Sequence, residues 1–136
     1  MAVSQRQIEA LAGFRSALRR FLAFSEEAAS DAGLTPQQYQ ALLAIKSHPR
    51  GTLRLGDLAD DLLLKKHGAV QLVDRMTAAR LVERRPSKTD ARAVHVVLTE
   101  KGDRLLMSLA SSHLTQLARR KKQFADILRQ LKQVSG

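Results

Sequence analysis

The chain has 136 residues, 44% hydrophobic and 26% charged, which is enough apolar material for one buried core. Its 23 Lys and Arg against 13 Asp and Glu give a formal net charge of +10, which favours a polyanionic partner, with nucleic acid ahead of an anionic membrane. Cysteine is absent, which excludes disulfides and thiolate metal sites. No apolar run approaches the roughly 18 residues of a membrane span, and the first residues lack the apolar core of a signal peptide, so we expect a cytoplasmic protein.

The positive charge is concentrated in the second half of the chain. Residues 1–64 carry 7 basic and 7 acidic groups, residues 65–104 carry 10 and 5, and residues 105–136 carry 6 and 1. None of the aromatic residues falls between 65 and 104, whereas proteins that bind single strands stack bases on exposed rings beside positive charge. The middle segment therefore favours duplex DNA. The four cations at 119–122 fit a solvated helix face as well as they fit contact with a polyanion.

Two helices are predicted in the first third of the chain. Apolar residues recur at helical spacing from Ile8 to Leu22, and we expect this helix to end near Ala32 because Gly33 can take the left-handed closing conformation. Residues 35–38, Thr-Pro-Gln-Gln, combine a cap, a proline at the first helical position and a capping-box glutamine. They predict a second helix that runs to about Ser47.

Two short amphipathic segments follow a short extended stretch at 52–55. Apolar residues at 55, 58, 59 and 62 share one helical face and predict a third helix. A fourth begins at Lys65 or Lys66 and runs to Ala79, with apolar positions that follow the i, i+3, i+4, i+7 rule. Two such helices separated by a few residues predict a helix-turn-helix.

A β-hairpin is predicted next. Leu81 and Val82 resume extended structure, residues 86–90 form a polar loop, and residues 94–98 alternate as a strand does. A hairpin after a helix-turn-helix is a wing. Thr99 is expected to cap a fifth helix, and apolar residues from Phe124 to Val134 mark a sixth. We therefore expect a mainly α winged helix-turn-helix with about six helices.

The predicted fourth helix carries the polar groups that a major-groove reader needs. Cationic groups in its first turn, where backbone N–H groups also favour phosphate, are Lys65, Lys66 and His67. Gln71 is of the type that pairs with adenine, and Arg75 can reach guanine or phosphate. An ion pair with the neighbouring Asp74 is the alternative role for Arg75.

The predicted hairpin supplies a second set of candidate contacts. Lys88 and Arg92 flank a tip that fits a minor groove. Asp90 lies two residues before Arg92, hence on the same side of a strand, where it can hold that guanidinium in place. The alternative is a solvated loop with a local salt bridge worth under ~1 kcal/mol. The wing residues that we expect at the DNA are Arg84, Arg85, Ser87, Lys88, Asp90 and Arg92.

Residues 90–102, DARAVHVVLTEKG, resemble the wing and exit signature of MarR-type regulators, an Asp-x-Arg followed by Leu-Thr-x-x-Gly. Residues 67–76 resemble that family's recognition helix, and residues 81–84 resemble its entry into the wing. The resemblance spans the whole chain in helix order and length.

The resemblance implies a homodimer that binds a pseudopalindromic operator and usually represses transcription. It implies a minor-groove role for Arg92 and a bracing role for Asp90. The implied division of the single domain 1–136 is a dimerisation region, 1–33 and 103–136, and a winged DNA-binding region, 34–102.

Three positions depart from the family pattern. Ala91 stands where many members have a second Arg, which lowers the charge of the wing. Gly68, which we count among the recognition-helix contacts, replaces a frequent Ser or Thr and adds helix flexibility. Arg80 replaces the usual Gly before Leu-Val, so the helix must close without the most permissive residue.

Proteins of this type often release DNA when a small aromatic or phenolic ligand binds between the dimerisation helices and the winged domain. A ligand acts only through different affinities for the DNA-competent and DNA-incompetent arrangements. Candidate pocket walls are Phe14, Phe21, Tyr39 and His113. Apolar residues at helical spacing are equally well explained as plain core.

Catalytic and metal sites are not indicated by the sequence. The four histidines show no i, i+4 pair, and the phosphate-binding and nucleophile-elbow motifs are absent, so we expect no enzyme, no metal and no cofactor. Three hypotheses remain: a dimeric, ligand-responsive DNA-binding repressor, a nonspecific architectural DNA-binding protein, and a winged-helix adaptor that binds an acidic protein. Duplex DNA, a second copy of the chain and a small effector are the partners of the first, without a membrane.

Overall fold

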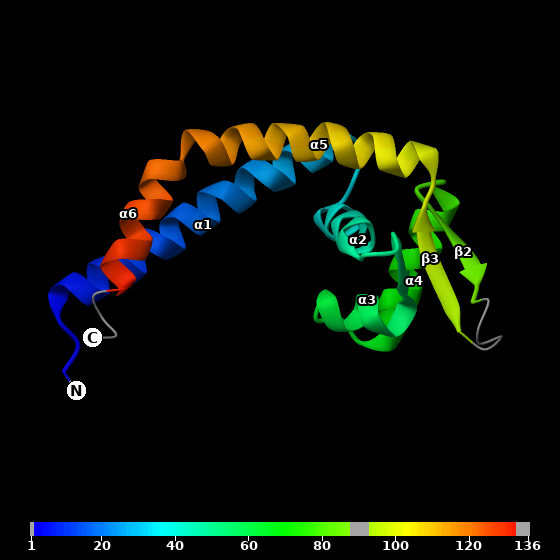
Figure 1. Ribbon diagram of the computed structural model, residues 1–136, viewed down its shortest axis with the longest axis horizontal. Coiled ribbons are helices and arrows are strands. Elements are labelled where there is room, and N and C mark those ends of the chain that lie inside the picture. The colour runs from blue at the N-terminus through cyan, green and yellow to red at the C-terminus, as the bar shows by residue number, and fades with distance from the viewer. Residues whose placement is uncertain (1, 88–92, 133–136) are drawn as a thin grey trace. The chain divides into compact units, whose positions relative to one another are not determined.

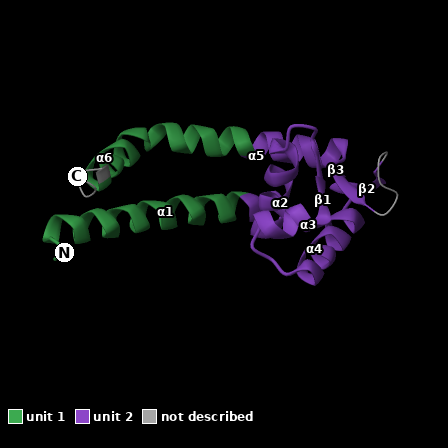
Figure 2. Ribbon diagram, turned by 60° about the horizontal axis from the view of Figure 1, so that its bottom comes forward, with its two compact units in different colours: residues 1–28, 110–136 green, residues 29–109 purple. Residues whose placement is uncertain are grey.

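The structure, a computed structural model, describes residues 2–87 and 93–132. The chain forms two compact units, residues 1–28 with 110–136 and residues 29–109 (Figure 2). Helices dominate both units, and a small sheet lies in the second (Figure 1). The predicted fold class, a mainly α winged helix-turn-helix, is confirmed.

The first unit is built from long helices. It contains most of α1 (Gln5–Asp31), the second half of α5 (Glu100–Arg119) and α6 (Lys121–Lys132). Helices α1 and α5 meet where the His113 ring lies edge-on to Phe21 and Phe24, with ring centroids 6.0 and 5.7 Å apart. The long first helix and the two C-terminal helices were all predicted.

The second unit contains the helix-turn-helix and the wing. Its helices are α2 (Pro36–Ser47), α3 (Leu55–Asp61) and α4 (Lys66–Ala78), and its strands are β1 (Thr52–Arg54), β2 (Val82–Pro86) and β3 (Val94–Leu98). The three strands form an antiparallel sheet in the order β1-β3-β2. Strand β1, predicted only as a short extended stretch, pairs Leu53 with Val96 and so completes the sheet.

The core of this unit joins every one of its elements. Its largest fully buried side chains come from α2, α3, α4, the start of the wing and α5, and include Leu42, Leu58, Met76, Leu81, Val96 and Leu106. The spacing of these residues in the sequence is what predicted the helices. Burial of this apolar face fixes how α4 is presented to solvent.

The predicted helix ends are confirmed. Gly33 takes a positive φ of 81° after α1. Thr35 and Gln38 form the reciprocal capping box at the start of α2, with N–O distances of 3.1 Å in both directions. Arg80 closes α4 with a φ of 61°, a conformation that glycine adopts at lower cost.

None of the helices within the described ranges, 2–87 and 93–132, is long and apolar enough to cross a membrane.

Candidate nucleic-acid interface

Helix α4 separates its residues cleanly by polarity. Ala69, Leu72, Val73 and Met76 are buried against the rest of the unit. The side chains on the opposite side are exposed, and these are Lys66, His67, Gln71, Asp74 and Arg75. The predicted polar face is therefore presented to solvent, with the half-buried Gly68 at its margin.

The N-terminus of α4 is open to an anion. Lys65 is its N-cap and makes no side-chain hydrogen bond to the backbone of the first turn. The first N–H groups of a helix have no partner within the helix, and the dipole places positive potential there. Since Lys65, Lys66 and His67 are all exposed at this end, the geometry suits a phosphate oxygen.

Asp74 is paired with Arg84 of β2. The Arg84 guanidinium donates to Asp74 Oδ1 at 2.5 Å and joins the recognition helix to the wing. Within the described chain Arg75 makes no ion pair with its neighbour Asp74. The alternation of β2 carries the signal for this pair, because Arg84 lies two residues after the buried Val82 and so on the same face.

The other predicted contact residues of the wing differ in exposure. Arg85 is exposed, and its guanidinium lies 3.6 Å from the Glu83 carboxylate. Ser87 is half-buried. Three predicted wing residues, Lys88, Asp90 and Arg92, lie outside the described residues, so the minor-groove contact and its brace stay predictions.

The junction between α4, the wing and α5 explains the Leu-Thr-x-x-Gly signature physically. Thr99 Oγ1 donates to the carbonyl of Arg80 at 2.6 Å and accepts from the N–H of Gly102 at 3.0 Å. Lys101 Nζ donates to the carbonyl of Ala79 at 3.0 Å. A Cβ at Gly102 would overlap the Leu81 carbonyl. The signature therefore closes the C-terminus of α4 and caps α5 at the same place.

The predicted effector-pocket residues are distributed over both units. Phe14 is half-buried, and Phe21 lies against the buried His113. Tyr39 belongs to the other unit, and burial raises the pKa of its hydroxyl above the ordinary value. The ring contacts of His113, which include Phe24, fit the plain-core alternative, and the effector pocket stays a prediction.

Metal-ligand geometry is not found in the described part of the chain. No group of three or more His, Asp or Glu side chains there could hold a metal ion.

Comparison with known proteins supports the winged helix-turn-helix directly. Residues 32–93 match the MarR family model. The HTH-type transcriptional repressor MdtR of Bacillus subtilis is 30% identical over 71 residues, which cover 52% of this chain and 44% of the repressor. The chain thus spans less than half of that relative.

Solved structures extend the likeness to the whole chain. AbsC, a MarR family transcriptional regulator from Streptomyces coelicolor, superposes with a TM-score of 0.76 at 24% identity, over 98% of this chain and 90% of AbsC. The MepR–DNA complex of Staphylococcus aureus gives a TM-score of 0.67 at 18% identity, over 89% and 97% of the two chains. The segment 32–93, which holds the helix-turn-helix and the first strand of the wing, is thus similar to the MarR family of transcriptional regulators, and the whole chain has the winged helix-turn-helix fold of these structures.

Proposed function

We propose that this protein is a homodimeric repressor that binds a pseudopalindromic DNA operator and is released from it by a small-molecule ligand. The observation that carries the proposal is the exposed polar face of α4, which stands opposite a buried apolar face on a winged helix-turn-helix.

The exposed face of α4 supplies both kinds of contact that a specific operator needs. Lys65, Lys66 and His67 lie where phosphate oxygens meet a helix N-terminus. Gln71 and Arg75 lie further along the same face and can reach base edges in the major groove. Arg84 is held by Asp74, and we assign it the task of fixing the wing to α4. Arg85, Ser87 and the wing tip would meet the neighbouring phosphates and minor groove.

Exposed apolar side chains on the first unit support a dimer. Helix α1 exposes Ile8, Leu11, Leu18 and Leu22 at its surface, each at 40% or more. Helices α5 and α6 together form an apolar hollow of about 520 Å³, lined by Leu114, Leu117, Phe124 and Leu128 among others. Patches of this kind are costly in water and mark contact surfaces. A second copy is the natural occupant, because an operator with two half-sites needs two recognition helices about 34 Å apart.

Repression and ligand release rest on analogy. The Bacillus subtilis relative is named a repressor, and a bound dimer blocks access to the DNA that it covers. A ligand would release the dimer by binding more tightly to an arrangement in which the two α4 helices do not fit adjacent grooves.

A nonspecific architectural role is the second candidate, and the net charge of +10 favours it. An adaptor role would use the same exposed face of α4 against an acidic protein.

Selection of bound fragments from the source genome tests these three roles. The repressor proposal expects a small set of fragments that share an inverted repeat, bound at least about a hundredfold more tightly than random duplexes of equal length. Equal binding of random duplexes would instead establish the architectural role. Failure to retain any duplex at low salt would overturn the repressor proposal and favour the adaptor role.

A further inference from the structure

The two faces of the wing sheet differ in what covers them. On one face Leu53 and Val96 lie directly opposite each other and both are buried. Arg84 continues this row on β2 and reaches Asp74 of α4. This face therefore packs toward the helices.

The other face carries a row of basic side chains across three strands. His95 at the centre lies opposite Arg54 on β1 and opposite Arg85 on β2. The next row places Thr52 opposite Val97. Directly opposite residues in antiparallel strands have Cβ atoms about 4.5–5.5 Å apart, so an imidazole stands between two guanidinium-bearing chains.

This face is hollowed into a groove of about 360 Å³. Its lining combines cations, hydroxyls and two apolar surfaces, and includes Arg50, Thr52, Arg85, Pro86, His95 and Val97. No acidic residue is among the described residues that line it. Arg85 has a distant ion-pair partner, Glu83 at 3.6 Å, in an exposed pair of the kind that contributes little.

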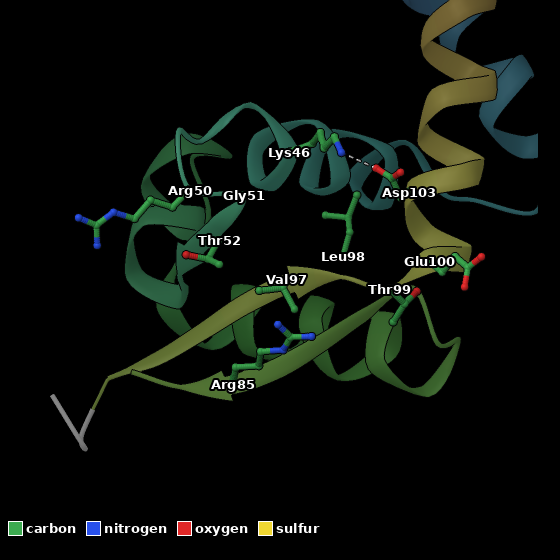
Figure 3. Close-up of a pocket in the computed structure, with 10 residues that line it drawn as sticks. All are labelled: Lys46, Arg50, Gly51, Thr52, Arg85, Val97, Leu98, Thr99, Glu100 and Asp103. Carbon is green, nitrogen blue, oxygen red and sulfur yellow. Dashed lines mark ion pairs between the residues drawn. The ribbon is translucent and has the colours of Figure 1, made fainter. Parts of the chain in front are cut away.

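A second hollow of about 320 Å³ adjoins the groove and shares Arg50, Thr52, Arg85 and Val97 with it (Figure 3). Its two acidic residues do not compete for the shared arginines. Asp103 is paired with Lys46 at 2.8 Å, and the Glu100 side chain points away from the other residues shown (Figure 3). Within the described residues, the acidic partner that remains for the shared arginines is therefore Glu83, in its exposed pair with Arg85.

His95 adds a polar atom that the fold does not use. Its Nδ1 lies 3.2 Å from the hydroxyl of Thr52, while its Nε2 is buried and makes no hydrogen bond within the described chain. Where Thr52 donates to Nδ1, the neutral ring carries its proton on Nε2 and is a donor. A buried donor without a partner is costly, and His95 is one of the residues that line the groove.

We propose that this groove binds the oxyanion of a small molecule, a phosphate or carboxylate group bound at Arg85, with the Arg50 side chain, which extends away from Arg85 in Figure 3, turning in to meet it. Guanidinium forks match the geometry of such oxyanions and form charge-assisted hydrogen bonds. The volume lies at the lower end of the range for small-molecule pockets, and the exposed Pro86 offers surface to an apolar body. The site lies within the second unit and differs from the effector pocket described above. A backbone phosphate of DNA is the other source of the same chemistry, and the test separates the two.

The test is a titration of the free full chain with inorganic phosphate, followed by amide and arginine NMR shifts at constant pH and ionic strength without DNA. We expect saturable shifts centred on Thr52, Arg85, His95 and Val97. The double variant Arg50→Gln/Arg85→Gln should lose affinity at least about tenfold. The matched control is Arg104→Gln, another exposed arginine of the same unit, which should stay within about twofold. The dispersion of each spectrum reports that the variant is folded.

Shifts that do not saturate, or that fall equally in the double variant and in Arg104→Gln, would overturn the site. Loss of duplex binding in the double variant, with no saturable phosphate binding in the free protein, assigns the groove to the DNA backbone and also overturns it. If the protein binds phosphate saturably but retains no duplex DNA, the oxyanion site is supported and the proposed function as a DNA-binding repressor is contradicted.

Discussion

The lack of a side chain at Gly102 allows the start of α5 to approach the backbone that follows α4. Its Cα faces the Leu81 carbonyl, which accepts from the N–H of Thr99 at 3.0 Å. Any side chain there must push α5 away from the end of α4. Gly68, in the first turn of α4, has a nearest neighbour 4.0 Å from the position of an added Cβ, which is ordinary contact.

Alanine at these two glycines should change the free energy of unfolding in opposite directions. Gly102→Ala should destabilise by about 1–3 kcal/mol because of the overlap. Gly68→Ala should stabilise by about 0.5–1 kcal/mol, since alanine is the better helix former and no contact is strained. Urea unfolding with each variant measures both, and a shift of the two midpoints in the same direction would contradict the close approach at Leu81.

Leu63, like Arg80, is a non-glycine residue in the left-handed backbone conformation. It lies in the turn between α3 and α4 with a φ of 56° and is 92% exposed. The left-handed region costs a non-glycine residue about 1 kcal/mol, and an exposed side chain recovers little by packing.

Leu63→Gly should therefore stabilise the protein, by up to about 1 kcal/mol after the extra freedom of glycine in the unfolded chain is counted. The control is Leu43→Gly in α2, at 40% exposure with helical geometry, which should destabilise by about 1 kcal/mol or more. Thermal unfolding of both variants decides the matter. A lower midpoint for Leu63→Gly would mean that its side chain packs in solution.

At the scale of elements, the ion pair between Asp74 and Arg84 ties α4 to β2 and changes which arginine is available to DNA. Arg84 has its charge balanced within the unit, whereas Arg75 makes no ion pair in the described chain. Two arginines that are equivalent by charge thus differ in whether the fold pairs them with a carboxylate.

Arg75→Ala should weaken duplex binding about tenfold and lower the slope of log affinity against log salt by about 1, because one released counterion is lost. Arg84→Ala should change the slope by much less and should instead cost up to about 1 kcal/mol of stability. Fluorescence anisotropy over a salt series compares the two. An equal loss of slope would show that the Asp74 pair opens on DNA and that Arg84 contacts a phosphate.

Features that depend on neighbouring residues in the chain were predicted from the sequence, whereas contacts between separate elements were not. The capping box at Thr35 and the positive φ at Gly33 depend on local chemistry, so they were predictable residue by residue. The closure of α4 at Arg80 was expected only from the resemblance, which places a glycine at this position. The Asp74–Arg84 pair depends on how a strand faces a helix, and the charge pattern alone suggested phosphate contact for Arg84. The row of basic side chains Arg54, His95 and Arg85 depends on the register of β1 with β3, which short strands do not specify from their own composition.

At the scale of the whole molecule, the two surfaces that carry the proposed function belong to different units. The exposed face of α4 belongs to the second unit, and the apolar hollow of α5 and α6 belongs to the first. The proposed DNA binding and the proposed dimer assembly can therefore be altered separately.

Leu128→Glu should separate the dimer while leaving each unit folded. Leu128 lines the hollow and is 60% exposed in the single chain, so the glutamate is tolerated in the monomer but would be buried unpaired between two copies, at a cost of several kcal/mol. Sedimentation equilibrium at micromolar protein should show a dimer for the parent chain and a monomer for the variant. Leu63→Glu, exposed on the other unit, is the control and should remain dimeric.

The monomeric variant also gives the sharpest check on operator recognition. A dimer gains from two half-sites only when they are spaced by about one helical turn, roughly 10 base pairs, because the two α4 helices are then in register with successive major grooves. The parent chain should therefore bind a full site far more tightly than a half-site and should lose that preference when 5 base pairs are inserted. Leu128→Glu should bind both lengths alike and ignore the insertion. A variant that is monomeric yet still prefers the intact full site would show that the spacing is read by the wing and α4 of one chain, and the dimeric operator complex would have to be abandoned.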